Sequence, residues 1–130
     1  MKVLHVNSYY YNSEFYKNLY DKQVENGLDI DVYVPKTISC HSRNFEYGDY
    51  TTVSNVYKKY ERIFFHLKHN KIFKDIDKKY NIKNFSLVHA HSLFSNGYIA
   101  NKLKQKYNLP YIVAVRDTDI NLFFRKIPYL

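Results

Sequence analysis

The segment spanning residues 85–119 has two short apolar runs on either side of a helical pattern. The first run is Leu87–Ala90, and the second, residues 111–115, follows Pro110. Between them, apolar and small residues recur at spacings of three and four, as in an amphipathic helix. They are Leu93, Gly97, Ala100, Leu103 and Tyr107, with Asn108 and Pro110 ending the helix. Strand, helix and strand in about 30 residues predict a βαβ unit whose parallel strands are buried on both faces.

A second unit of this kind is predicted at the start of the chain. Residues 3–6 read as a short buried strand, and residues 28–34 as a second strand closed by Pro35. Asn12 or Ser13 caps the helix between them, and Gly27 follows its end. Its predicted apolar face consists of Phe15, Leu19 and Val24, with Tyr16 and Tyr20 beside it.

The middle of the chain supplies one more strand and a long helical region. Residues 36–49 have turn chemistry, and residues 50–56 are β-branched enough for a strand. Residues 57–81 predict a bent helix, or two helices broken near His69–Asn70, with two apolar faces. One face has Tyr57, Tyr60, Phe64 and Leu67, and the other has Phe73, Ile76 and Tyr80. With a last helical piece at residues 120–126, the prediction is an α/β, Rossmann-like three-layer αβα sandwich with a parallel sheet in the order 3-2-1-4-5.

Length and composition indicate the number of domains, the cellular compartment and the kinds of partner to expect. At 130 residues the chain is expected to be a single domain. It has one cysteine, Cys40, and strand pattern from its second residue, so we expect no disulfide framework or signal peptide and a cytoplasmic location. Its net charge of +8 comes mostly from lysine, which suits a solvated surface. A basic surface can also attract nucleic acid or anionic lipid.

Candidate site residues follow the predicted strands, at the edge where open parallel sheets bind ligands. The loop after the first strand contains Ser8, Tyr9 and Tyr10 but no glycine, so a dinucleotide phosphate site there is not expected. The tyrosines either stack on a sugar ring or pack as a lid over the core. After the last strand, Arg116 is expected to reach over the sheet edge. Asp117 or Thr118 can cap the next helix with Asp119 in its first turn, and the alternative is that Asp117 and Asp119 bind substrate.

Two histidine pairs raise the question of a metal. His89 and His91 face the same side of a strand, but no third ligand is near them in sequence, so no metal is expected. His66 and His69 are expected to be incidental solvated side chains. Asp117 and Asp119 share a D-x-D spacing, which we discount as a metal site.

Several of these features together resemble the acceptor-side, N-terminal domain of family 4 glycosyltransferases. The resemblance lies in His89-Ala90-His91, Gly97, Ala100, Pro110 and Arg116-Asp117-Thr118-Asp119, and residues 2–7 are similar to the first strand of that family. These enzymes have two Rossmann-like domains, an arrangement called GT-B. The resemblance runs end to end and is weakest over residues 36–83. This chain departs from the family in lacking a glycine pair after the first strand and in having Asp117 where glycine is common.

The resemblance implies a hexosyltransferase. It would transfer a sugar from a nucleotide sugar to a glycan or lipid-linked acceptor in bacterial surface-polysaccharide synthesis, without a further cofactor. His91 would be the catalytic residue at the acceptor cleft. Substrate-binding residues would be Ser8, Tyr9, Tyr10, Arg116, Asp117 and Asp119. The donor-side E-x7-E motif is absent, so we expect a truncated N-terminal half, inactive alone, whose nucleotide sugar binds through a second domain.

Two other interpretations remain open. A basic, aromatic-rich α/β module can bind single-stranded nucleic acid or an anionic surface without catalysis. Nucleic acid is the less favoured partner, because aromatics also fill core-type positions and no nucleic-acid motif appears. Lysines and aromatics between Tyr57 and Lys79 suggest peripheral contact with the inner face of the cell membrane. The alternative is that those aromatics face the sheet and the lysines solvate the outer side.

Overall fold

The computed structural model describes residues 1–11, 13–39, 45–117 and 119–124. Within these residues, the strands form one five-stranded sheet in the order β3-β2-β1-β4-β5. All neighbouring strands are parallel. The strands are β1 (Lys2–Val6), β2 (Asp29–Thr37), β3 (Thr51–Tyr57), β4 (Leu87–Ala90) and β5 (Tyr111–Val113). The predicted fold class and strand order are confirmed, although β5 ends two residues before the predicted limit at Val115.

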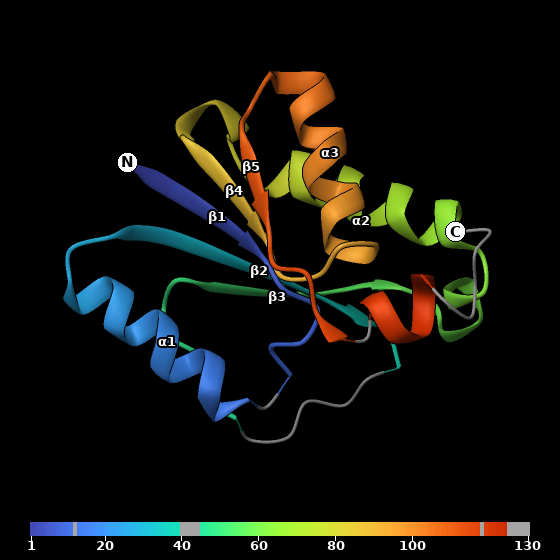
Figure 1. Cartoon of the computed structure of the whole chain (residues 1–130), viewed down its shortest axis with the longest axis horizontal. Helices are drawn as coiled ribbons and strands as arrows, with labels where there is room; N and C mark the ends of the chain where they lie inside the picture. Colours follow the sequence, from blue (N-terminus) through green and yellow to red (C-terminus); the bar gives the residue numbers. More distant parts are fainter. Residues whose placement is uncertain (12, 40–44, 118, 125–130) are drawn as a thin grey trace.

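Helices cover both faces of the sheet (Figure 1). Helix α1 (Glu14–Glu25) packs on one face, and α2 (Phe65–Lys79) and α3 (Ser95–Tyr107) pack on the other. Two short 3₁₀ helices, η1 (Lys59–Arg62) and η2 (Ile82–Asn84), precede α2 and β4, and a π-helix, η3 (Asp119–Phe124), follows β5. The last helix therefore begins at Asp119, one residue before the predicted start. Residues 125–126 of the predicted helix lie outside the described part. No helix in the described part is long and apolar enough to cross a membrane.

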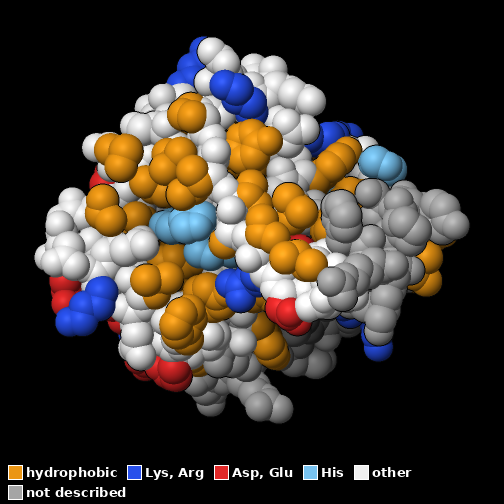
Figure 2. Space-filling model, in the orientation of Figure 1, with side chains coloured by type: hydrophobic (Ala, Val, Ile, Leu, Met, Phe, Trp, Pro, Cys, Tyr) orange, Lys and Arg blue, Asp and Glu red, His pale blue; other side chains and the backbone are white. Residues whose placement is uncertain are grey.

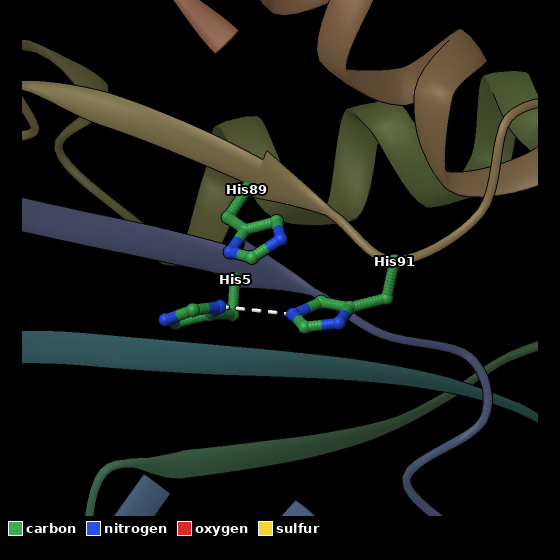
Figure 3. A group of neighbouring side chains, drawn as sticks. All are labelled: His5, His89 and His91. Carbon is green, nitrogen blue, oxygen red and sulfur yellow. Dashed lines mark hydrogen bonds between the residues drawn. The ribbon is translucent and has the colours of Figure 1, made fainter. Parts of the chain in front are cut away.

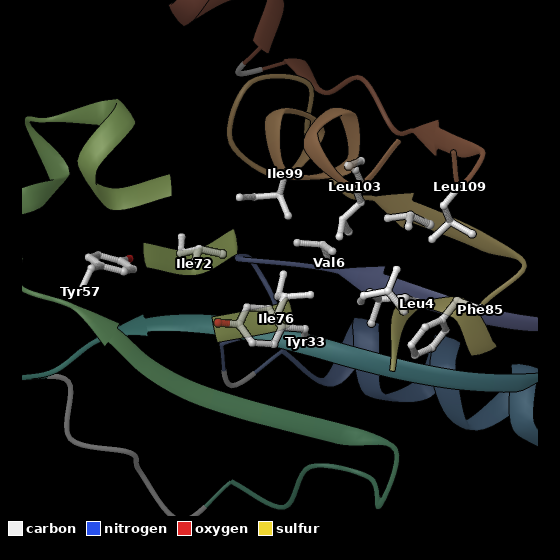
Figure 4. Close-up of a cluster of buried hydrophobic side chains, with 14 residues drawn as sticks. Leu4, Val6, Tyr33, Tyr57, Ile72, Ile76, Phe85, Ile99, Leu103 and Leu109 are labelled. Atoms are coloured by element: carbon white, nitrogen blue, oxygen red, sulfur yellow. The ribbon is translucent and has the colours of Figure 1, made fainter. Parts of the chain in front are cut away.

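The main core lies between the sheet and helices α2 and α3 (Figure 4). Leu4 and Val6 of β1 are fully buried there beside their register partners Val88 and Ala90 of β4. Helix α3 approaches the chain after β4 closely at Gly97, where a Cβ atom would lie 3.1 Å from the Ser92 carbonyl oxygen. Glycine therefore lets α3 sit against the carboxyl end of β4, where the site is built.

The predicted apolar face of α1 is wrong. Phe15 and Leu19 are exposed, and the helix turns Tyr16 and Tyr20 toward the sheet instead. Tyr20 is fully buried because its hydroxyl has a partner, accepting a hydrogen bond of 2.9 Å from Asn7 Nδ2. A tyrosine with a satisfied hydroxyl buries more apolar surface than a leucine at the same place.

The predicted break in the second helical region is also wrong. Helix α2 continues through His69 and Asn70, and the break lies before it, at Ile63–Phe64. The two predicted apolar faces differ in burial. Tyr60, Phe64 and Leu67 are exposed and only Tyr57 of that face is buried, whereas Ile76 on the other face is fully buried.

Truncating each face of α2 by the same three heavy atoms tests this orientation. Ile76→Ala should lower the free energy of unfolding by about 2–5 kcal/mol, because it leaves a cavity in the main core. Leu67→Ala, on the exposed face, should change it by less than about 1 kcal/mol. Urea denaturation followed by circular dichroism measures both values, and equal losses would contradict the orientation described.

Candidate functional site

A pocket of about 440 Å³ opens at the carboxyl edge of the sheet. Its walls come from the loop after β1, the segment joining β4 to α3, the region around η1 and the first turns of α2, and the start of η3. Of the residues predicted from sequence, Ser8, Tyr9 and Asp119 line it. The other lining residues are Tyr57, Arg62, Phe65, Lys68, His69, Ser92, Phe94 and Ser95.

Asp119 connects two walls of this pocket. Its side chain is 1% exposed, and Oδ2 accepts hydrogen bonds from the backbone amides of Leu93, at 3.0 Å, and Arg116, at 2.9 Å. The carboxylate therefore ties the chain after β4 to the chain after β5. Its predicted place at the site is consistent with this position, and its role here is to hold the loops together.

Arg116, Asp117 and Tyr10 do not line the pocket. Arg116 donates through Nε to the carbonyl oxygen of His91 at 2.7 Å and stacks its guanidinium over the Tyr9 ring, 4.9 Å from the ring centroid. Asp117 is exposed and accepts a hydrogen bond from Asn121 within the turn that begins η3. Tyr10 is fully buried among aromatic rings, so it packs in the core instead of offering a face to a sugar.

His91 also lies outside the pocket, on the α1 side of the sheet (Figure 3). Its side chain is buried, and its Nε2 is 3.0 Å from Nδ1 of His5 and 3.1 Å from the Tyr20 hydroxyl. The half-buried His89 ring stacks on it with centroids 4.2 Å apart. The sequence therefore predicted the pair His89–His91 on one face but missed His5, which β1 brings beside it.

Burial changes the protonation of these three rings. Burial, together with the neighbouring imidazoles, lowers the pKa of His91 to about 3 and that of His5 to about 4. Burial also lowers the pKa of His89. A buried imidazolium would lose its hydration, so the three rings are neutral at pH 7.

His69 is a pocket residue that sequence reasoning placed in solvent. It is 2% exposed, its Nδ1–H donates to the Phe65 carbonyl at 2.7 Å, and its Nε2 is 2.7 Å from Ser95 Oγ. Because Nδ1 is the donor, Nε2 accepts the proton of the Ser95 hydroxyl. A signal was present in the sequence, since Phe65, His69, Ile72 and Ile76 follow the helical period of a core-facing stripe.

The charge of the pocket is mixed but has a cationic side. Arg62 and Lys68 line the wall formed by η1 and α2, and Asp119 lies in another wall. Lys68 packs its ammonium over the Tyr57 ring, 4.7 Å from the centroid, and burial lowers its pKa. Two cations among serine hydroxyls and aromatic rings suit an anionic ligand that also carries hydroxyl groups.

Comparison with known proteins gives structural neighbours only. No family model and no curated protein matches the sequence. The chain is similar to sucrose-phosphate synthase from Thermosynechococcus elongatus, with a TM-score of 0.68 at 10% identity over 95% of this chain and 35% of that one. A second structure of that enzyme from the same organism has a TM-score of 0.63 at 14% identity, over 92% of this chain and 66% of that one. At identities this low, the structural similarity shows a shared fold and nothing more. This chain spans 35% of the first neighbour's length.

Burial of His69 predicts acid sensitivity. Burial lowers its pKa from 6.5 to about 4. Between these two pH values His69 is protonated in the unfolded chain but neutral in the folded chain. Its contribution to stability is complete above about pH 6.5 and is lost as the pH falls toward 4. His69→Gln should reduce the loss of unfolding free energy between pH 7 and pH 5 by about 1–2 kcal/mol. Urea titrations at both pH values measure this, with the exposed His66→Gln as control, and an unchanged loss in His69→Gln would contradict the burial.

Proposed function

We propose that this chain is the acceptor-side domain of a hexosyltransferase that transfers a sugar from a nucleotide sugar to a glycan or lipid-linked acceptor in surface-polysaccharide synthesis. The observation that carries the proposal is the pocket at the carboxyl edge of the parallel sheet, lined by Ser8, Tyr9 and Asp119. Open parallel sheets bind their ligands at this edge. Support also comes from the fold, which the chain shares with sucrose-phosphate synthase, a GT-B glycosyltransferase.

The pocket residues suit an acceptor that carries a phosphate. Arg62 and Lys68 would bind the phosphate, and the hydroxyls of Ser8 and Ser95 would hydrogen-bond the sugar. Tyr9 is 40% exposed, so its ring offers one face to the acceptor while Arg116 covers the other. The nucleotide sugar would be held by a second domain across the pocket, because transfer requires donor and acceptor side by side.

A transfer assay tests this proposal. The longest natural form of the protein is incubated with radiolabelled nucleotide sugars and a lipid extract containing polyprenyl-phosphate-linked sugars. Label should move into the lipid fraction with one of the donors. Ser8→Ala and Lys68→Gln should each lower kcat/KM by more than about tenfold, which is 1.4 kcal/mol of lost transition-state binding.

Lys104→Gln is the control, since this exposed lysine lies on α3 and does not line the pocket. Its transfer rate should equal that of the wild type. Transfer that survives both pocket substitutions would move the acceptor site elsewhere, and the absence of transfer with every donor would overturn the proposed activity.

We also propose that the protein contacts an anionic membrane through the segment around η1. Tyr60, Ile63 and Phe64 are 57%, 83% and 58% exposed, and Leu67 lies beside them on α2. Lys58 and Lys59 are exposed at the start of this segment. Exposed apolar side chains next to lysines suit shallow insertion into an anionic surface. Arg62 lines the pocket from the same segment, so membrane contact would present the pocket to a lipid-linked acceptor.

Vesicle sedimentation tests the membrane contact. The protein should pellet with phosphatidylserine vesicles at 0.1 M salt and remain in the supernatant at 1 M, where the Debye length falls from about 10 Å to about 3 Å. Phe64→Ser should weaken binding by roughly tenfold, because burying a phenylalanine is worth about 1.5–3 kcal/mol. Serine also suits the N-cap position of Phe64, so the helix remains stable. Phe15→Ser removes another exposed phenylalanine as the control, and equal weakening by both would argue against this surface.

A further inference from the structure

Three imidazole rings converge on the α1 side of the sheet. His5 comes from β1, His89 from β4, and His91 immediately follows β4 (Figure 3). One ring nitrogen from each lies within 4.8 Å of the others. Three neutral imidazoles are a ligand set that zinc and related transition metals bind readily.

The His5 ring is oriented as a ligand would be. Its Nε2 is 3.1 Å from Oε1 of Gln23 on α1. An amide oxygen only accepts, so His5 Nε2 carries the proton and Nδ1 keeps its lone pair, directed at His91. Metal-bound histidines are fixed in this way by a hydrogen bond from their other ring nitrogen.

Two groups compete for the single nitrogen Nε2 of His91. His91 Nε2 faces both His5 Nδ1, at 3.0 Å, and the Tyr20 hydroxyl, at 3.1 Å. With a proton on Nε2, His91 donates to His5, but the hydroxyl proton of Tyr20 finds no acceptor on His91. Without that proton, His91 accepts from Tyr20 but places its lone pair against that of His5. A cation bound by both lone pairs would remove the repulsion between the two nitrogens.

We propose that His5, His89 and His91 bind a single divalent transition-metal ion of the zinc type. Metal–nitrogen bonds of roughly 2.0–2.1 Å at tetrahedral angles separate two ligand nitrogens by about 3.3 Å. The 3.0 Å separation of His5 Nδ1 and His91 Nε2 is close to that value. The Tyr20 hydroxyl borders the fourth position, which a water molecule or the hydroxyl itself would fill.

His89 is the ligand that must move to complete the set. Its ring now stacks on His91 at an interplanar angle of 18° with centroids 4.2 Å apart, so one ion cannot lie in the planes of both rings. The side chain is half-buried, and no hydrogen bond within the described residues holds its ring. It can therefore tilt toward the other nitrogens. Figure 2 shows histidine atoms among apolar side chains at the surface of the molecule. The half-buried His89 leaves a route for the ion from solvent.

The proposed ion would have a structural role. It would tie β1 to β4 beneath the pocket and, through Gln23 and Tyr20, join both strands to α1. None of the three ligands lines the pocket itself. The two proposals therefore rest on different residues, and failure of one leaves the other standing.

Direct metal analysis tests the site. The purified chain is stripped with a chelator, dialysed against micromolar Zn²⁺, and assayed by mass spectrometry for bound metal. One zinc per chain is expected, and Co²⁺ in its place should give the visible absorption of a tetrahedral site. His5→Gln and His89→Gln should each weaken Zn²⁺ binding by at least about 100-fold, and Gln23→Ala, which frees the His5 ring, by about 10–100-fold.

His66→Gln is the matched control, because it removes an exposed histidine of α2 and should bind Zn²⁺ like the wild type. Gln23→Ala and His89→Gln change half-buried side chains, and circular dichroism of the metal-free variants checks that they fold. Failure of the wild type to retain zinc at micromolar free metal overturns the proposal. So does a loss in His66→Gln equal to that in His89→Gln, which would indicate scattered surface binding.

Discussion

The parallel register between β1 and β4 is the constraint on which the rest of this structure depends. Residues opposite each other in parallel strands point to the same face of the sheet. His5 pairs with His89, while Leu4 pairs with Val88 one residue earlier. A shift of β4 by one residue would send His89 into the main core and Val88 toward α1. The register thus fills the core with aliphatic side chains and gathers on the other face histidines as much as 86 residues apart.

The helices cover the two faces of the sheet unequally, and this explains why the histidine side chains lie on only one face. Helices α2 and α3 seal one face, and the side chains of Leu4, Val6, Val88 and Ala90 beneath them are buried. On the other face, α1 packs over the half of the sheet that contains β2, where Val32 is fully buried. Ile112 of β5, the register partner of His89, remains 50% exposed. The histidines therefore lie at a boundary between buried and open sheet, where an imidazole can be desolvated on one side and reachable on the other.

The strands could be predicted from sequence because each is a short apolar run, such as Leu87–Ala90, bounded by a turn or a proline. Parallel order followed from the alternation of strands with helices. The orientation of α1 could not be predicted in the same way, because its buried residues are tyrosines. Whether a tyrosine is buried depends on a hydroxyl partner such as Asn7, which is supplied by the fold and not by the helix itself.

The candidate site was predictable only where its residues directly follow strands. Ser8, Tyr9 and Asp119 line the pocket for that reason, since strand ends meet at one edge of a parallel sheet. Arg62, Lys68 and His69 come from outside the strands, and their approach depends on where the break before α2 falls. The expected place of His91 at the acceptor cleft came from the family resemblance and not from the residues around it. The structure turns that ring toward His5 and gives only its carbonyl oxygen to Arg116.

That carbonyl contact joins the histidine cluster to the pocket. Arg116 binds the His91 carbonyl oxygen and stacks on Tyr9, and its own amide is held by Asp119, which also holds the Leu93 amide. The backbone from His91 to Leu93 is therefore fixed at both ends, by groups that also shape the pocket wall. Ser92, between them, lines the pocket. Any force that positions the His91 side chain, whether from its imidazole neighbours or from a bound ion, acts on this short segment, so the geometry of the pocket depends on side chains that never contact its contents.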